Sequence, residues 1–202
     1  MKDDRVVVMA SVRASLAKRR GDKAALPDWD PALVVARPAK AFGSLVEQFR
    51  YKFEAAGGVF VDGWAELEGF LAEKGLICGY VDPVLIEYVR AWPSGTTTTF
   101  DRGEIDCYEF SVTRATAGIA ESGTILLTEE KSSSRLGALS SWVHVAVLNE
   151  CDLLGTIPEA IEKIGSDKAT VFVTGPSKTA DVEGILIKGV HGPGIQVCCL
   201  VQ

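Results

Sequence analysis

A single carboxylate placed between glycines marks the first segment that could do chemistry. Residues 117–124 read Ala-Gly-Ile-Ala-Glu-Ser-Gly-Thr, in an otherwise apolar strand and turn. Glycine lets a backbone turn sharply or lets a ligand approach closely, so Glu121 could serve as a general base, a nucleophile or a partner for a ligand amine. Gly123 and Thr124 would then contact the ligand. The alternative is a turn carboxylate that only accepts backbone hydrogen bonds.

A second polar segment follows a predicted strand near the end of the chain. Residues 174–183 read Thr-Gly-Pro-Ser-Lys-Thr-Ala-Asp-Val-Glu. Ser177 is a favourable N-cap residue, and the helix that we expect to begin there would offer free amides and a positive dipole to an anion. The predicted ligand contacts of this segment are Thr174, Gly175, Ser177, Lys178, Thr179 and Asp181, with His191 at the edge of the site.

We expect Glu121 and the turn at residues 174–181 to face one cleft that binds a small anionic ligand. Both segments combine glycine with polar residues beside apolar strands, and a pocket is one reason for such a composition. The alternative is a capped helix whose polar groups only satisfy one another. His191 could equally be a structural histidine held by hydrogen bonds.

Three common signatures are nearly present, and each fails at a defined position. Residues 174–179 resemble the end of a phosphate-binding loop, but Ser177 stands where a glycine is needed before the lysine. Residues 189–194 are rich in glycine without the G-x-G-x-x-G order. The sequence has no G-x-S-x-G elbow, and its five cysteines include no C-x-x-C pair. We therefore predict no metal site or iron–sulfur cluster in this chain, and free thiols in a reducing cytoplasm.

The elements that must hold these segments alternate between helix and strand in the first half of the chain. Helices are predicted from apolar spacing and capping signals over residues 4–20, 44–56, 64–74 and 82–92. Short apolar runs predict strands over residues 59–61 and 76–80. This alternation indicates an α/β protein with a mostly parallel sheet and helices on its faces. The polar residues 93–104 are predicted to form a mobile loop.

Strands dominate the second half. They are predicted over residues 108–113, 124–128, 142–148, 169–173, 185–190 and 195–201, with helices over 158–164 and after Ser177. Because residues 21–41 are rich in proline without a sustained period, we divide the chain into an N-terminal helix with a Pro-rich linker, 1–41, and an α/β domain, 42–202.

The charge distribution argues against nucleic acid as a partner. The 202 residues carry a net charge of −6, and residues 58–202 hold 10 Lys and Arg against 20 Asp and Glu, so the main body would repel phosphate. The basic N-terminal part could be a docking arm or a solvated helix face. No apolar run approaches the roughly 18 residues of a membrane span, and no signal peptide is evident, so a cytoplasmic location is expected.

The two polar segments, in this order and spacing, resemble motifs of the LUD domain family, specifically its lactate utilisation protein C branch. Residues 118–124, 174–183 and 189–193 carry the resemblance, with Ser122, Lys178 and Val182 replacing the family's threonine, arginine and isoleucine. The stretch between them also follows the family pattern, at Arg135, Leu139, His144 and Val145. One departure is Ser141-Trp142, where the family usually carries a proline before the strand.

This resemblance implies a three-layer α/β fold like that of the NagB/RpiA/CoA-transferase group. It also implies a role in oxidising L-lactate to pyruvate together with iron–sulfur partner proteins, with no cofactor in this chain. In CoA transferases of similar fold a glutamate is the nucleophile, which by analogy suggests Glu121 as the catalytic residue. Two alternatives stay open: a non-catalytic assembly subunit, and an acyl- or nucleotide-binding enzyme of the same fold.

Overall fold

The computed structural model describes residues 4–19, 41–128, 135–164, 169–180 and 186–202. The chain divides into two compact units, Met1–Arg37 and Pro38–Gln202. Within the first unit, helix α1 (Asp4–Arg19) confirms the predicted N-terminal helix. Its apolar side chains are exposed, among them Val6, Met9 and Leu16. The predicted linker lies outside the described residues, apart from Ala41.

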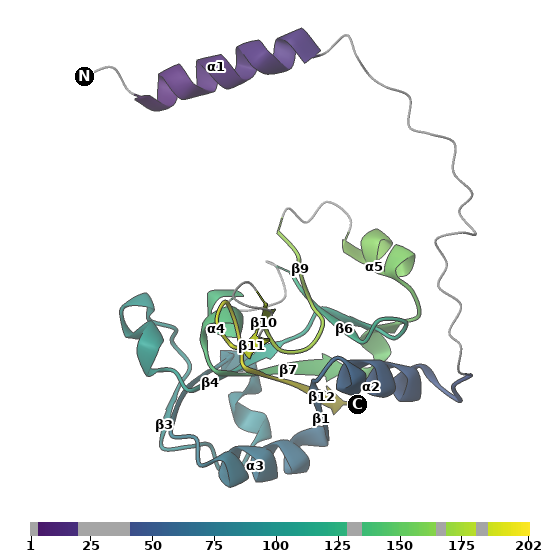
Figure 1. The fold of residues 1–202 in the computed structure, drawn as a ribbon. Coiled ribbons are helices and arrows are strands. Elements are labelled where there is room, and N and C mark those ends of the chain that lie inside the picture. The colour runs from purple at the N-terminus through teal and green to yellow at the C-terminus, as the bar shows by residue number, and fades with distance from the viewer. Residues whose placement is uncertain (1–3, 20–40, 129–134, 165–168, 181–185) are drawn as a thin grey trace. The chain divides into compact units, whose positions relative to one another are not determined.

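A six-stranded parallel sheet forms the centre of the second unit (Figure 1). In spatial order its strands are β1 (Val59–Asp62), β12 (Ile195–Val201), β7 (Val143–Asn149), β4 (Phe110–Arg114), β2 (Cys78–Val81) and β3 (Gly95–Thr97). Every neighbouring pair runs parallel. The predicted α/β fold with a mostly parallel sheet is therefore confirmed.

Helices begin and end where the sequence provides capping residues. Helix α2 (Leu45–Ala55) follows Ser44, whose Oγ accepts the Glu47 N–H at 3.1 Å. Helix α3 (Gly63–Lys74) ends at Gly75, which adopts a left-handed conformation with φ 63°. That conformation suits glycine because it has no Cβ. The short helix α4 (Arg135–Ser140), which the sequence analysis did not predict, precedes β7.

Side-chain alternation along the strands gives the sheet two apolar faces. On one face Val143, Val145 and Val147 of β7 pack with Leu67 and Leu71 of α3. On the other face Ala146 and Leu148 pack with Phe49 and Phe53 of α2 and with Ala138 of α4. Successive strand residues point to opposite faces, so β7 contributes to both layers. Helices thus cover both sides of the sheet, which gives the expected three layers.

A second, four-stranded sheet lies beside this core. Its order is β8 (Leu153–Leu154), β5 (Ala117–Ile119), β6 (Thr124–Leu127) and β9 (Val171–Val173). Ile125 and Leu127 join the α2 side of the core, whereas Leu126 faces Ala160 of helix α5 (Ile157–Ile164). No helical crossover separates β5 from β6, and the two strands pair antiparallel. The sequence analysis predicted some of these strands but not that they form a separate sheet.

Several predicted elements were wrong. The helix expected after Ser177 is the strand β10 (Lys178–Thr179), paired antiparallel with β11 (Ile187–Lys188). The helix predicted over 82–92 is a 3-10 helix, η2 (Pro83–Tyr88), although Asp82 caps it as expected. The loop predicted over 93–104 contains the edge strand β3 and the start of the 3-10 helix η3 (Arg102–Cys107). Strand β9 is not buried as predicted, since Phe172 is 47% exposed.

A row of polar side chains crosses the buried α2 face of the parallel sheet. Thr113 Oγ1 lies 2.9 Å from His144 Nε2, and His144 Nδ1 lies 2.9 Å from Gln196 Oε1. Because the amide oxygen can only accept, Nδ1 carries the proton, and Nε2 accepts the Thr113 hydroxyl. Burial lowers the pKa of His144 to about 4, so the ring is neutral at pH 7. This network joins the neighbouring strands β4, β7 and β12.

No helix in the described part of the chain is long and apolar enough to cross a membrane.

Candidate functional site

The structure brings the two predicted polar segments into direct contact. Thr124 Oγ1 lies 2.7 Å from Thr174 Oγ1, and Ser122 Oγ lies 2.8 Å from Thr124 Oγ1. The contact follows from the antiparallel pairing of β6 with β9, which aligns Ile125 with Val173 and so places the adjoining residues side by side. Hydrogen-bonded hydroxyl groups thus link Thr124 to Thr174, although the two residues are 50 positions apart in the sequence.

Glu121 lies at the start of helix α5. Its Oε1 accepts the Ile157 N–H at 2.6 Å, and its own N–H donates to the Gly155 carbonyl at 3.1 Å. The first amides of a helix have no partner within the helix, so a carboxylate placed there satisfies a donor and interacts favourably with the helix dipole. The carboxylate thus has a hydrogen-bonding role within the protein.

Two glycines of the motifs allow the turns to touch the C-terminal end of α2. Gly123 has φ 66°, and a Cβ there would lie 2.3 Å from Phe53 N. Gly175 has φ 77°, and its Cβ would lie 2.7 Å from the Ala56 carbonyl oxygen. Neither position has room for a side chain. Here the close approach that glycine permits is between two segments of backbone.

The remaining residues of the second segment also contact the protein. Lys178 Nζ donates to the Ala56 carbonyl at 2.5 Å, so the lysine caps the end of α2. The Ser177 N–H donates to Pro193 O, and Ser177 O accepts the Gly189 N–H. The predicted helix is wrong, so no helix N-terminus at Ser177 offers its amides to an anion. Thr179 pairs with Ile187, and His191 is exposed. Asp181 lies outside the described residues.

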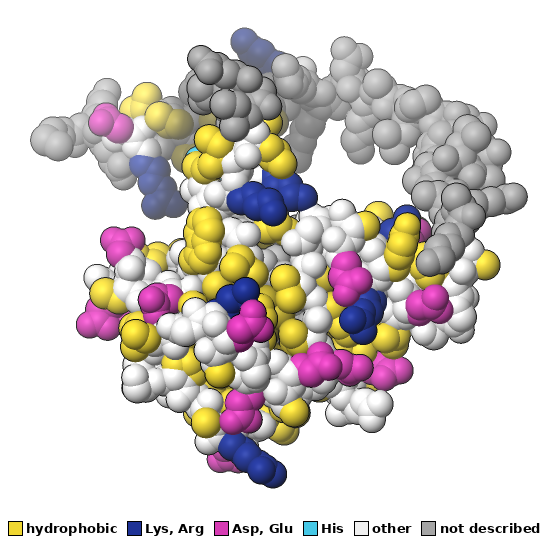
Figure 2. Space-filling model, turned by 60° about the horizontal axis from the view of Figure 1, so that its bottom comes forward, with side chains coloured by type: hydrophobic (Ala, Val, Ile, Leu, Met, Phe, Trp, Pro, Cys, Tyr) yellow, Lys and Arg dark blue, Asp and Glu magenta, His cyan; other side chains and the backbone are white. Residues whose placement is uncertain are grey.

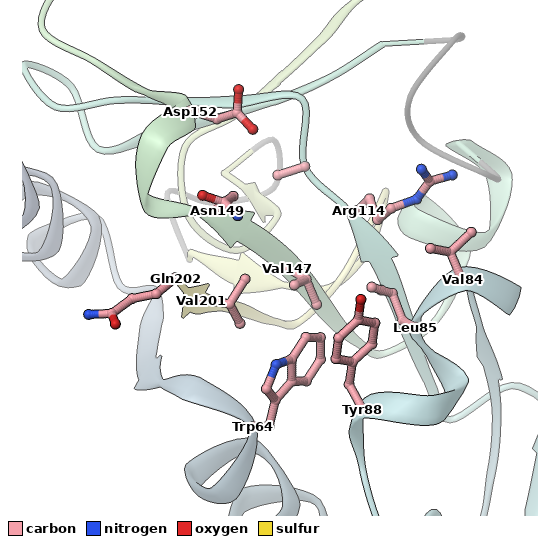
Figure 3. A pocket seen from close by; sticks show the side chains of 11 residues that line it. Trp64, Val84, Leu85, Tyr88, Arg114, Val147, Asn149, Asp152, Val201 and Gln202 are labelled. Carbon is pink, nitrogen blue, oxygen red and sulfur yellow. The ribbon is translucent and has the colours of Figure 1, made fainter.

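A cavity of about 420 Å³ lies at a different place, beside the carboxyl ends of the parallel strands (Figure 3). Arg114 ends β4, Asn149 ends β7 and Val201 ends β12, and all three line it. Ligands of open α/β sheets bind at this edge, because the loops that leave the strands there enclose a crevice. None of the predicted site residues lines this cavity.

Arg114 is the cationic side chain of this cavity. Its Nε lies 2.6 Å from Asp82 Oδ2, and the exposed fractions of the two side chains are 39% and 1%. Asp82 Oδ1 also accepts the Val84 N–H at 3.0 Å, so the buried carboxylate is fixed by two donors. A guanidinium carries five N–H donors in a planar fork. Asp82 therefore orients a partly exposed group whose chemistry suits a carboxylate.

Apolar and aromatic side chains form the opposite part of the cavity. The rings of Trp64 and Tyr88 stack with centroids 4.8 Å apart and an angle of 15° between their planes. Figure 3 shows the two rings side by side below Val147. Asp152 lies at the rim, paired with Lys163 at 2.6 Å. It sits in the 3-10 helix η4 (Glu150–Asp152).

Sequence reasoning missed the residues of this cavity, although a signal existed. Arg114 and Asn149 directly follow predicted strands, and Asp82 comes two residues after the end of another. In a parallel sheet those positions lie at one edge. The glycine-rich turns form more conspicuous sequence motifs, and in the structure Gly123 and Gly175 contact the end of α2.

Trp142, where the chain departs from the family pattern, lies over two glycines. A Cβ at Gly189 would come within 2.2 Å of its ring, and one at Gly194 within 2.5 Å. The same tryptophan lines a second cavity, of about 230 Å³, together with Ser140, Gly189 and Gly192. The 189–193 loop is thus shaped around this side chain.

The thiols do not fit an iron–sulfur or zinc site. Cys198 and Cys199 are neighbours on β12, so their side chains belong to opposite faces of the sheet. Cys107 and Cys151 are exposed. Among the described residues, no group of three or more His, Cys, Asp or Glu could hold a metal ion.

The surface carries mixed charge. On the face of the α/β unit seen in Figure 2, basic side chains are interspersed with acidic and hydrophobic ones. Two of the ion pairs are Arg50–Glu54 on α2 and Lys163–Asp152 beside the cavity.

Known proteins resemble this chain over about half of its length. "Lactate utilization protein C" of Bacillus subtilis (strain 168) is 30% identical over 135 residues, 55% of this chain and 56% of that protein. The protein of the same name from Exiguobacterium sp. is 30% identical over 125 residues, 53% of this chain and 54% of that protein. The matched region thus spans about half the length of these relatives.

A solved structure supports the fold. The crystal structure of a DUF162 family protein from Deinococcus radiodurans superposes with a TM-score of 0.54, at 20% identity, and covers 78% of this chain and 96% of that chain. The sequence pattern of the LUD domain matches residues 101–201, which is half of the chain. This region includes both polar segments and the strands β4, β7 and β12. The chain belongs to the LUD domain family.

Proposed function

We propose that this chain takes part in L-lactate utilisation, as a component of a system that oxidises L-lactate to pyruvate. The names of its relatives in Bacillus subtilis and Exiguobacterium support this role. The observation that carries the proposal is Arg114, oriented by the buried Asp82 in a cavity at the carboxyl edge of the parallel sheet. A small hydroxy acid has the carboxylate that such an arginine binds.

The proposed oxidation of L-lactate requires that its electrons be transferred from the cavity to an acceptor. Oxidation of L-lactate to pyruvate removes two electrons and two protons, so an acceptor is required. Because the thiols of this chain are scattered along the sequence, we assign the acceptor to iron–sulfur partner proteins. This chain would bind and position the acid, while its partners carry the electrons away.

A genetic experiment tests the role. Deleting the chain in its host should impair growth on L-lactate and spare growth on pyruvate. Complementation with Arg114→Gln should fail, whereas Arg50→Gln should restore growth. Arg50 is a matched control because it is also paired with a carboxylate, Glu54, and its side chain is 51% exposed. Equal growth of the deletion strain on both carbon sources would overturn the proposal.

The partner assignment has its own test. A tagged full-length chain should co-purify from lactate-grown cells with iron and acid-labile sulfide, and the purified chain alone should contain neither. Stoichiometric iron in the isolated chain would place the redox centre here instead.

A catalytic role for Glu121, which does not line the Arg114 cavity, is a separate proposal, and it competes with a structural role for the same residue. Glu121, Thr124, Thr174 and Lys178 all bond within the protein, which favours a non-catalytic scaffold role for these segments. Glu121→Gln keeps an acceptor for the Ile157 N–H and removes the charge. Loss of lactate-dependent growth with unchanged folding supports catalysis by Glu121, and full growth leaves the scaffold role.

A further inference from the structure

We infer that the cavity at the carboxyl edge of the sheet prefers 2-hydroxy acids with a bulky apolar or aromatic side chain, such as L-phenyllactate, over L-lactate itself. The inference rests on the proposed function for the carboxylate end of the ligand. It adds what the rest of the cavity recognises.

The size of the cavity is the first argument. Its volume of about 420 Å³ lies in the range of roughly 300–1,000 Å³ that is typical of pockets for drug-sized ligands. L-Lactate has only six non-hydrogen atoms and would leave most of this space to water. A ligand that also fills the far part of the cavity buries more apolar surface, and binding strengthens with that surface.

The lining is the second argument, because its chemistry changes from one end to the other. Arg114 and the buried Asp82 form the charged end. Asn149, Asp152 and Gln202 add polar groups along one side of the cavity, and the other side is apolar and aromatic, formed by Trp64, Leu85, Tyr88, Val147 and Val201 (Figure 3). A methyl group needs no such surface. A phenyl ring would lie against it and make favourable contacts with the aromatic pair.

The strand register sets the distance between these two ends. Arg114 of β4 is aligned with Val147 of β7, and Asn149 of β7 is aligned with Val201 of β12. Neighbouring strands are about 4.8 Å apart and each residue advances about 3.3 Å, so Val201, two strands across and two residues along from Arg114, lies roughly 12 Å from it along the floor. In L-phenyllactate two carbon atoms join the carboxylate to the ring, and a molecule of that length fits within this span.

Tyr88 is the side chain that best separates the two ligands. It belongs to η2, stacks on Trp64 and is 56% exposed, so it can be shortened with little effect on the core. In Figure 3 it lies beside Trp64, on the side of the cavity opposite Asp152. Tyr88→Ala should therefore weaken the binding of a ring while leaving the binding of a small acid almost unchanged.

Titration calorimetry of the full chain with L-phenyllactate and L-lactate tests the inference. Burial of a phenyl ring predicts binding of L-phenyllactate about 30-fold tighter than that of L-lactate. Tyr88→Ala should reduce the affinity for L-phenyllactate about tenfold and change that for L-lactate less than twofold. Tyr51→Ala is the matched control, a tyrosine on α2 that is 48% exposed and does not line the cavity, and it should change neither affinity.

Arg114 is tested with two variants, since removing it leaves Asp82 buried without its cation. Arg114→Gln should weaken the binding of both acids. Arg114→Lys keeps the charge but loses the planar fork, so it should weaken their binding less. Circular dichroism shows whether each variant folds.

The outcomes separate this inference from the proposed function. Equal or weaker binding of L-phenyllactate overturns the inference, as does a Tyr88→Ala protein that loses both ligands alike. Absence of binding by either acid overturns it too. The proposed function is decided separately, by growth of the deletion strain on L-lactate.

Discussion

The hydroxyl groups of Thr124 and Thr174, 50 positions apart in the sequence, lie 2.7 Å apart where strand β6 meets strand β9. Ser122 adds a second hydroxyl to the chain. The contact joins the two segments that most resemble the family motifs. Both segments also rest on the end of α2, so the motifs form one packed unit around a helix terminus.

This hydroxyl pair should contribute measurably to stability. Thr124→Val should lower the free energy of unfolding by about 1–2 kcal/mol, because Thr124 is buried and its hydroxyl bonds those of both Ser122 and Thr174. Thr174→Val should lower it by only about 0.5–1 kcal/mol, because Thr174 is exposed and Thr124 keeps its bond to Ser122. The double variant should lower the free energy of unfolding by less than the sum of the two single effects. The difference measures the coupling between the two hydroxyl groups. Urea denaturation gives all three values. Thr99→Val, at an exposed position, should change stability by less than about 0.5 kcal/mol.

Glycine is required at position 123 for two reasons that a matched pair of variants can separate. Gly123→Ala would combine a strained φ of 66° with a Cβ 2.3 Å from the backbone of α2, and it should cost more than about 3 kcal/mol or prevent folding. Gly63→Ala has a similar φ, 75°, but its Cβ would meet nothing within 4 Å. We expect a cost of about 1–2 kcal/mol there. Urea denaturation measures the free energy of unfolding of both variants. An equal loss in the two would show that the close contact of position 123 with α2 contributes nothing to the effect.

His144 makes the stability of the fold dependent on pH. Its pKa is about 4 in the folded protein against an ordinary value of 6.5, because burial disfavours the charged ring. The unfolded chain therefore binds the proton more readily, and stability falls as the pH drops from 6.5 to 4. The full effect is about 3 kcal/mol. Urea midpoints measured across this range for wild type and His144→Gln should differ in slope, with the variant less dependent on pH.

The thiols should react in a defined order. Cys107 and Cys151 are exposed and should be alkylated first by iodoacetamide at pH 8. Cys78 should follow slowly, since burial and the neighbouring Cys107 raise its thiol pKa. Burial raises the pKa of Cys199 to about 12, and Cys198 lies on the opposite, equally buried face. Both should react only after unfolding. Mass spectrometry of the alkylated peptides follows each site, and rapid labelling of Cys198 in the native protein would contradict this order.

Local patterns determined much of the fold. Strand β12 was predicted with its observed bounds, 195–201, because a continuous apolar run is typical of a strand buried on both faces. The helix predicted after Ser177 failed because the pairing of Lys178 with Lys188 competes with the cap, and that pairing is set by residues ten positions away. Local capping signals carry no information on such a partner.

The site was harder to predict than the fold. Sequence patterns singled out Glu121, Gly123 and Ser177 for their unusual composition, and in the structure these residues make turns and backbone contacts. The cavity is built from single residues at strand ends, such as Arg114 and Asn149, which form no contiguous motif. Only the order of strands in the sheet brings them together.

The end of α2 also constrains how the chain is made. Lys178, which caps that end, is 122 residues downstream of the carbonyl it binds. During synthesis α2 therefore leaves the ribosome long before the turns that cover it. Its aromatic residues Phe49 and Phe53 pack against β7 and β12 in the folded protein, and they have no such partners until those strands have been synthesised. Contacts of such long range slow folding and leave apolar surface exposed in the meantime. A nascent chain halted before residue 143 would present this helix to chaperones.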